Sequence, residues 1–146
     1  PNTENQFQLM GREANAVEPG KRMLSSMSPT IVTKDNQPVL VTGSPGGGTI
    51  ITTTLQVILN IVDHKMTIED AVSMPRFHHQ WKPNSIFHER FAFSPDTKLA
   101  LEAKGHINFV ESKWGRGIGD ANSILYRDGV IQGVKDPRAD GTAVGF

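Results

Sequence analysis

Apolar residues recur at helical spacing between residues 49 and 63, the longest periodic stretch in the chain. Ile51, Leu55, Ile58 and Val62 follow the spacing that places side chains on one face of a helix. Further apolar residues fill the opposite side of this stretch: Ile50, Val57, Leu59 and Ile61. The pattern therefore predicts a helix that is buried on most of its faces.

Two short runs of β-favouring residues precede this helix, at Ile31–Thr33 and Val39–Thr42. Because turn-forming residues lie between them, the two runs predict a hairpin. A second helix is predicted between Thr67, which begins a variant capping box, and Pro75. A third is predicted from Pro95, which follows the N-cap residue Ser94, to about Gly105.

The remaining periodic segments predict strands at Ile107–Glu111, Ser123–Tyr126 and Val130–Val134. Asp128-Gly129 is a strong turn signal that joins the last two of these strands in a hairpin. The connections are hairpins rather than βαβ units, so the order favours antiparallel sheets with helices packed on them, an α+β fold. Residues 1–20 are polar and without periodicity, and we expect a loop there.

The length of 146 residues is that of one ordinary domain, so we treat residues 1–146 as a single domain. Fifteen basic and fifteen acidic residues give zero formal charge and are interspersed, which argues against a nucleic-acid binder. No apolar run is long enough to span a bilayer. The absence of cysteine excludes disulfides, thiolate metal sites and a cysteine nucleophile, and it fits an extracytoplasmic bacterial protein.

The sequence Gly43-Ser44-Pro45-Gly46-Gly47-Gly48 joins the predicted hairpin to the long helix. Consecutive glycines let backbone amides approach a ligand, and the helix adds its positive end, so this loop can bind a phosphate, a carboxylate or a developing oxyanion. A tight turn without a ligand explains it equally well. Two specific motifs are excluded: Thr49-Ile50 replaces the Lys-Ser/Thr of a phosphate loop, and Gly43 and Ser44 are adjacent, which breaks the serine-hydrolase spacing.

Other polar clusters have ordinary structural explanations. The hydroxyls of Ser25 and Ser26 can bind an anion, but such groups more often solvate a loop. His78 and His79 point to opposite faces of an extended segment and cannot share one metal, and His88 lacks the second histidine of a zinc protease. We expect all five histidines to be structural. Three aspartates lie among Gly, Pro and Asn, where Asp usually serves turns: Asp120, Asp136 and Asp140.

Taken together, three strings are far more specific than their parts: GREANAVEPGKRMLSSMSPTIV, VTGSPGGGTIITTTLQVILN and MPRFHHQW. In this order they closely resemble the small subunit of γ-glutamyltransferases. The segments SPDT, EAKGH, GDANSI and KDPR extend the resemblance over nearly the whole chain. The resemblance implies an N-terminal-nucleophile hydrolase with an αββα sandwich, of which this chain supplies the C-terminal part of the catalytic subunit.

The family's chemistry follows from the resemblance. A precursor cleaves itself into a large and a small subunit, and the new N-terminal threonine of the small subunit attacks the γ-glutamyl amide of glutathione and related compounds. A γ-glutamyl-enzyme ester forms, and water or an acceptor amino acid or peptide resolves it. The resemblance implies no metal or organic cofactor, and it implies the large subunit as partner and a periplasmic or secreted location.

Site roles carry over only at matching positions. Ser25 and Ser26 match the pair that hydrogen-bonds the α-carboxylate of the substrate, and Gly46 and Gly47 match the pair that forms the oxyanion hole. Residues 1–20 correspond to a loop near the active-site mouth. The sequence departs from the family at Met23, where Pro is frequent. It departs again at Gly48-Thr49, where Ser-Arg is common, and both leave room for shifted specificity.

The family's small subunit begins some tens of residues before Pro1, with the threonine nucleophile. We therefore expect this chain alone to be inactive and to occur only within a larger assembly. Two alternatives stay open: a relative with another acyl group, such as a cephalosporin acylase or a poly-γ-glutamate-processing enzyme, and a non-catalytic family member. The serine pair argues for a substrate with a free α-carboxylate, and so for a γ-glutamyl group.

Overall fold

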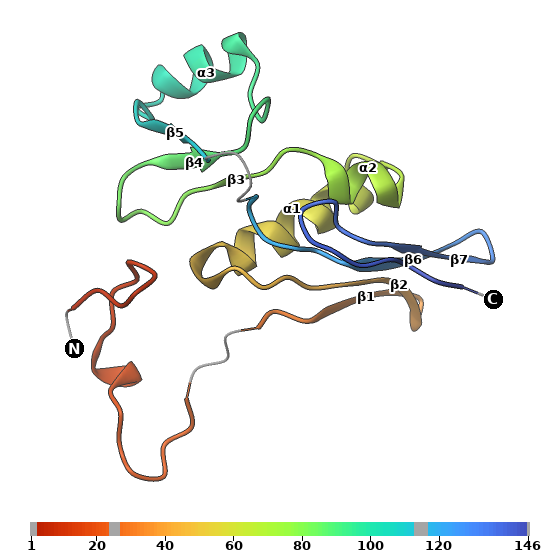
Figure 1. Ribbon diagram of the computed structural model, residues 1–146, viewed down its shortest axis with the longest axis horizontal. Helices are drawn as coiled ribbons and strands as arrows, with labels where there is room; N and C mark the ends of the chain where they lie inside the picture. The colour runs from red at the N-terminus through yellow and green to blue at the C-terminus, as the bar shows by residue number, and fades with distance from the viewer. Residues whose placement is uncertain (1–2, 24–26, 113–116, 146) are drawn as a thin grey trace.

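The computed structural model of the chain describes residues 3–23, 27–112 and 117–145. These residues form a four-stranded sheet with two helices on one face, and a smaller three-stranded sheet that carries a third helix (Figure 1). The N-terminal segment belongs to neither sheet, and Gln80 holds it to the rest of the chain by donating to Phe7 O. Among its described residues, only the short 3₁₀ helix η1 (Glu13–Asn15) is helical. The loop predicted for residues 1–20 is confirmed apart from this element over the residues described.

The larger sheet is built from two hairpins, β1 (Thr30–Lys34) with β2 (Gln37–Thr42), and β6 (Ser123–Arg127) with β7 (Val130–Val134). The strand order is β1-β2-β6-β7, and every pairing is antiparallel. Both hairpins turn through residues with positive φ: Asp35, Asn36, Asp128 and Gly129. Both predicted hairpins are confirmed, and the centre of the sheet joins segments that are distant in the sequence.

Two helices cover one face of this sheet, α1 (Ile50–Val62) and α2 (Ile68–Ser73) (Figure 1). The Thr67 side chain caps α2 by accepting a hydrogen bond from the Asp70 amide at 3.1 Å, as its sequence predicted. Helices and sheet share one core of fully buried apolar residues: Leu40, Val57, Ile61, Ile68, Ala71, Val72, Ala121 and Leu125.

The prediction that α1 is buried on most faces is wrong for this chain. Ile51, Leu55, Leu59 and Val62 lie on one side of the helix, and their exposed fractions range from 38% to 71%. The sheet covers only the opposite side, where Val57 and Ile61 pack in the core. The apolar pattern is therefore wider than the surface that this chain can cover.

The smaller sheet contains β3 (Phe77–His78), β4 (Ile86–His88) and β5 (Phe109–Glu111). The helix that this sheet carries, α3 (Pro95–Glu102), is capped by Ser94, whose hydroxyl accepts from the Thr97 amide at 3.2 Å. β4 and β5 are parallel, with α3 as their crossover. This corrects the prediction of purely antiparallel sheets: the short β4 did not stand out as a strand, so the βαβ unit was not recognised.

Candidate active site

The segment between β2 and α1 contains two glycines at which any side chain would be strained. Gly46 has φ +139° and Gly47 has φ +58°, conformations that residues with a side chain rarely adopt. A Cβ on Gly46 would lie 2.4 Å from Thr49 Oγ1, and one on Gly47 would lie 2.5 Å from the ring of Phe7. Backbone geometry and neighbouring atoms thus both favour glycine in this turn.

In this turn the Gly46 carbonyl is hydrogen-bonded, whereas, among the residues that the structure describes, the amides of Gly46 and Gly47 are not. Thr49 donates to Gly46 O twice, from its amide at 3.1 Å and from its hydroxyl at 2.9 Å, which fixes the 3₁₀ helix η2 (Gly47–Thr49). The N–H groups of Gly46 and Gly47 donate to no acceptor in the described part of the chain. Since α1 follows at once with its positive end, these amides can hold an anion or a developing oxyanion.

A cavity of about 380 Å³ opens beside this turn. That size lies within the range typical of small-molecule sites. Its lining comes from the N-terminal loop, the turn, the small sheet and the segment before β6: Phe7, Gln8, Gly46, Gly48, Thr49, His78, Gln80, Phe87, Ser112, Gly117, Ile118 and Gly119. Segments between Phe7 and Gly119 that are far apart in the sequence therefore meet beside the glycine turn.

A chain of side-chain hydrogen bonds runs along one wall of this cavity. Gln80 Oε1 accepts from His78 Nε2 at 2.7 Å, and His78 Nδ1 contacts Thr52 Oγ1 on α1 at 2.8 Å. Gln80 also donates through Nε2 to Phe7 O at 3.1 Å, which ties the N-terminal loop to the wall. His78 is buried and partnered, as is His88, in agreement with their predicted structural role.

The loop Gly117–Ala121 forms the opposite wall and touches the glycine turn directly. A Cβ built on Gly46 would lie 3.6 Å from Gly119 Cα, and one on Gly119 would lie 2.6 Å from Ser44 Oγ. The Asp120 amide donates to Ser44 Oγ at 2.9 Å, and the Ser44 hydroxyl donates to Pro45 O at 2.6 Å. The two loops are thus held face to face at backbone contact distance.

A buried network of four charged residues lies behind this loop. Arg76 and Asp136 have exposed fractions of only 2% and 0%, and their side chains form an ion pair at 2.6 Å. Arg138 contacts Asp136 at 3.0 Å and binds both oxygens of Glu89 at 2.6 Å. Two carboxylates and two guanidinium groups balance in charge, which allows them to be buried together.

The network shifts the pKa values of its members. Burial raises the pKa of Glu89, but hydrogen bonds from Arg138 and from the Ile118 and Arg76 amides outweigh it and hold that pKa below its ordinary value. Burial likewise raises the pKa of Asp136, and the Ala121 and Arg138 amides together with Arg76 reverse the effect. Both carboxylates are therefore charged at neutral pH.

Of the two predicted oxyanion-hole glycines, Gly46 lines the cavity, and Gly47 is the next residue of the same turn but is not part of the lining. Ser25 and Ser26 lie outside the described residues. The prediction that Asp136 serves a turn is confirmed, because its Oδ1 accepts from the Arg138 amide at 3.0 Å and its carbonyl accepts from the Ala139 amide at 3.4 Å. The sequence did not predict that the same carboxylate is fully buried between Arg76 and Arg138. No local pattern in the sequence marks this network, since Arg76 and Asp136 are 60 residues apart.

Over the described ranges, no group of three or more His, Asp or Glu side chains has the arrangement of metal ligands. Among the helices of residues 3–23, 27–112 and 117–145, none combines the length and the apolar character that a membrane crossing demands.

Comparison with known proteins gives a consistent result. The family model described as Gamma-glutamyltranspeptidase matches residues 1–146. The chain is 48% identical over 140 residues to the glutathione hydrolase proenzyme of Escherichia coli K12, covering 95% of this chain and 23% of that protein. It thus spans about a quarter of the length of that curated relative.

A solved structure and an acylase are also similar to this chain. A mutant of the Helicobacter pylori γ-glutamyltranspeptidase superimposes with a TM-score of 0.86 at 47% identity, covering 95% of this chain and 75% of that chain. An acylase proenzyme (ACY 1) of Pseudomonas strain V22 is 35% identical over 132 residues, covering 90% of this chain and 23% of that protein.

Proposed function

Because this chain belongs to the γ-glutamyltranspeptidase family, we propose that the complete protein hydrolyses γ-glutamyl amides such as glutathione and transfers the γ-glutamyl group to acceptor amines. Membership confirms the resemblance drawn from the sequence strings. It also confirms the α+β, N-terminal-nucleophile hydrolase fold, of which this chain forms a part. One observation carries the proposal: Gly46 lines a cavity at the start of α1, and the amides of Gly46 and Gly47 have no acceptor among the residues that the structure describes.

The proposed reaction begins with an N-terminal threonine that lies outside these 146 residues. Its hydroxyl attacks the γ-carbonyl carbon while its α-amine takes the hydroxyl proton, and the carbonyl oxygen becomes an oxyanion. The amides of Gly46 and Gly47 donate to that oxyanion. Collapse expels the amine with its proton and leaves a γ-glutamyl ester, which water or an acceptor amine then cleaves by the same route.

Substrate recognition and access are further parts of the proposal. Ser25 and Ser26 are proposed to bind the substrate's α-carboxylate through their hydroxyls. Residues 1–20 are proposed to form a loop at the mouth of the site, supported by the contact of Phe7 with Gly47. Alanine at both serines tests the first assignment: a KM for the γ-glutamyl donor that stays unchanged would refute it.

The substrate class is tested by comparing two anilides on the complete protein. We expect a γ-glutamyl anilide to be hydrolysed at least 100-fold faster in kcat/KM than the glutaryl anilide, which keeps the carboxylate but lacks the α-amino group. Groups built to bind a polar substituent typically discriminate by about 10⁴-fold or more against a substrate that lacks it. Release of the aniline is followed by absorbance.

The reverse preference would assign the protein to the acylases, as the similarity to the Pseudomonas acylase allows. Hydrolysis of neither anilide by protein that has matured into two chains would favour a non-catalytic family member. Release of a γ-glutamyl group from poly-γ-glutamate alone would identify a polymer-processing enzyme. The three alternatives therefore give three different outcomes in one set of assays.

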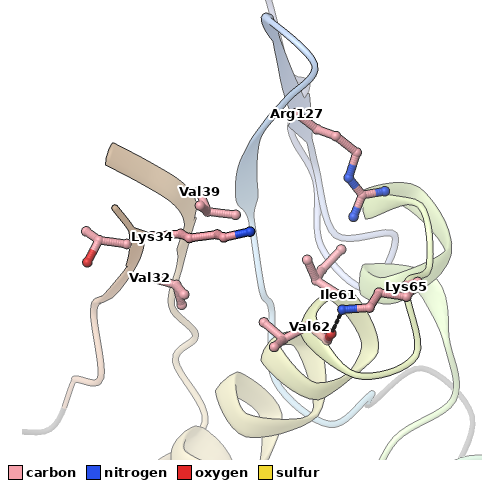
Figure 2. Close-up of a pocket in the computed structure, with 8 residues that line it drawn as sticks. Val32, Lys34, Val39, Ile61, Val62, Lys65 and Arg127 are labelled. Carbon is pink, nitrogen blue, oxygen red and sulfur yellow. Dashed lines mark hydrogen bonds between the residues drawn. The ribbon is translucent and has the colours of Figure 1, made fainter. Parts of the chain in front are cut away.

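We also propose that the partner of this chain is the large subunit of the same precursor. Two apolar surfaces support this: the α1 side formed by Ile51, Leu55, Leu59 and Val62, and the sheet face that carries Ile31, Ile124 and Ile131. A cavity of about 530 Å³ lies at the end of α1, with Val32, Val39 and Ile61 as its apolar floor and Lys34, Lys65 and Arg127 around it (Figure 2). Such surfaces are typical of protein interfaces.

Leu59→Glu in the complete precursor tests this surface, because a charge placed in an apolar interface has no partner there. We expect association with the large subunit to weaken at least tenfold, measured by analytical ultracentrifugation of the matured protein. Leu99→Glu on α3 is the matched control, since Leu99 is 64% exposed and lies outside this surface. Equal association in both variants would refute the assignment.

We propose that the protein is bacterial, like the Escherichia coli relative, and that it is located in the periplasm or outside the cell. Cell fractionation followed by the γ-glutamyl anilide assay decides this, and activity confined to the cytoplasmic fraction would exclude it.

A further inference from the structure

Glu89 lies at the end of β4, and its carboxylate gathers donors from three segments. Oε1 accepts from the Ile118 amide at 2.8 Å and Oε2 accepts from the Arg76 amide at 2.8 Å. Arg138 binds both oxygens through Nε and Nη2 at 2.6 Å. One carboxylate therefore fixes the start of the loop Gly117–Ala121 with respect to the small sheet.

The same network holds the rest of this loop. Arg76 Nη1 donates to Ile118 O at 2.8 Å, and the Ala121 amide donates to Asp136 Oδ2 at 2.6 Å. Both ends of the loop are thus fixed by buried charged groups, and Gly119 stands between them. Charge-assisted hydrogen bonds of this kind are short and directional, so the loop has little freedom to shift.

Gly119 passes this constraint to the glycine turn. Its Cα faces Gly46 closely, with φ +74° and no room for a side chain beside Ser44 and Thr53. The next residue, Asp120, donates its amide to Ser44 Oγ at 2.9 Å. A displacement of Ile118 would therefore press on the turn through Gly119 or pull on it through Ser44.

We propose that Glu89 is a positioning residue for the oxyanion-binding turn and acts through the loop Gly117–Ala121. Glu89 is not among the residues that line the cavity, so its proposed effect is indirect. Its carboxylate sets the place of Ile118, and the loop sets the distance at which the Gly46 and Gly47 amides meet the oxyanion. The inference rests on the proposed function, because it assigns the turn the role of oxyanion hole.

Glu89→Gln in the complete precursor tests this proposal. Glutamine keeps the size and one carbonyl oxygen, but it loses the charge and cannot serve all four donors. We expect kcat for γ-glutamyl anilide hydrolysis, counted per matured small subunit, to fall about 10²-fold, the effect of a misplacement of about 1 Å. We expect KM to change less than twofold.

A pair of ligands separates positioning from simple stabilisation. A tetrahedral boronate analogue of the γ-glutamyl group needs the oxyanion amides, whereas glutamate itself needs them far less. We expect Glu89→Gln to weaken the boronate at least tenfold and to leave glutamate affinity unchanged. Ile61→Ala, in the core at 3% exposure, is the stability control and should lower the melting temperature without changing that ratio.

Glu111→Gln is the matched chemical control, because Glu111 is exposed on β5 opposite His88 in the register. It should leave kcat and boronate affinity unchanged. The proposal is overturned if Glu89→Gln keeps wild-type kcat, or if it loses boronate and glutamate affinity equally. If Glu89→Gln does not mature, Ser44→Ala is measured instead. A lower kcat with an unchanged KM supports the positioning of the turn by the loop Gly117–Ala121, and an unchanged kcat overturns it.

Failure of the proposed function looks different from failure of this inference. If the wild-type protein does not cleave the γ-glutamyl anilide, the function itself is wrong and no variant needs to be compared. If the wild type is active and Glu89→Gln equals it in kcat and in boronate affinity, only the positioning role falls.

Discussion

Gly46→Ala in the complete protein is expected to lower kcat for γ-glutamyl anilide hydrolysis by about 10²–10³-fold, the loss that follows removal of one oxyanion donor. The added methyl group would lie 2.4 Å from Thr49 Oγ1, and the backbone at φ +139° would be strained. Relief of both requires the turn to change shape, which redirects its amides. Steady-state kinetics on matured protein measures the effect, and KM should change little.

Gly105→Ala is the matched control for this prediction. Gly105 also has positive φ, +94°, but it ends α3 and has no atom within 4 Å of an added Cβ. Alanine there also carries a backbone cost, and we expect a lower melting temperature with unchanged kcat. An equal loss of kcat in both variants would show that Gly46→Ala acts through stability rather than through the oxyanion.

Asp136→Ala is expected to have the largest effect on folding, a loss of about 3–5 kcal/mol in the free energy of unfolding. The substitution leaves Arg76 buried, at 2% exposure, without its ion-pair partner at 2.6 Å. It also removes the acceptor of the Ala121 amide. Urea unfolding of the complete protein followed by circular dichroism measures the change, and poor yield of matured protein is its first sign.

Two further variants test whether the lost ion pair causes this destabilisation. Asp140→Ala changes an exposed aspartate in the same segment, and its unfolding midpoint should match the wild type. Arg76→Met combined with Asp136→Ala should recover part of the stability, because the uncompensated charge is gone. A double variant that is less stable than Asp136→Ala would contradict the ion-pair explanation.

The sequence was sufficient where structure is decided locally. Asn36 and Gly129 tolerate the positive φ that their hairpins require, and Thr67 and Ser94 cap their helices as their positions indicated. The residues of the Gly46–Gly47 turn predicted either an anion-binding loop or a tight turn without a ligand, because consecutive glycines between a strand and a helix suit both. The choice of an oxyanion hole among these came from the family resemblance.

What the sequence did not reveal depends on pairs that are distant along the chain. Asp136 was predicted as a turn residue and is one, but no residue near it in the sequence indicates that it also pairs with Arg76. The parallel pairing of β4 and β5 was missed because β4 is only three residues long. The exposed side of α1 was predicted as buried, since an apolar pattern says that a surface is covered but not by which chain.

The contacts that shape the glycine turn join residues that the ribosome makes at different times. Ser44 meets Asp120 across 76 residues, and Arg76 meets Asp136 across 60. At about 5–20 residues per second, the ribosome makes Asp120 about 4–15 s after Ser44. During that interval the hairpin β1–β2 and the helix α1 can form from local contacts. In a nascent chain, the residues of the turn are therefore present before Asp120, whose contact with Ser44 helps to fix the shape of the turn.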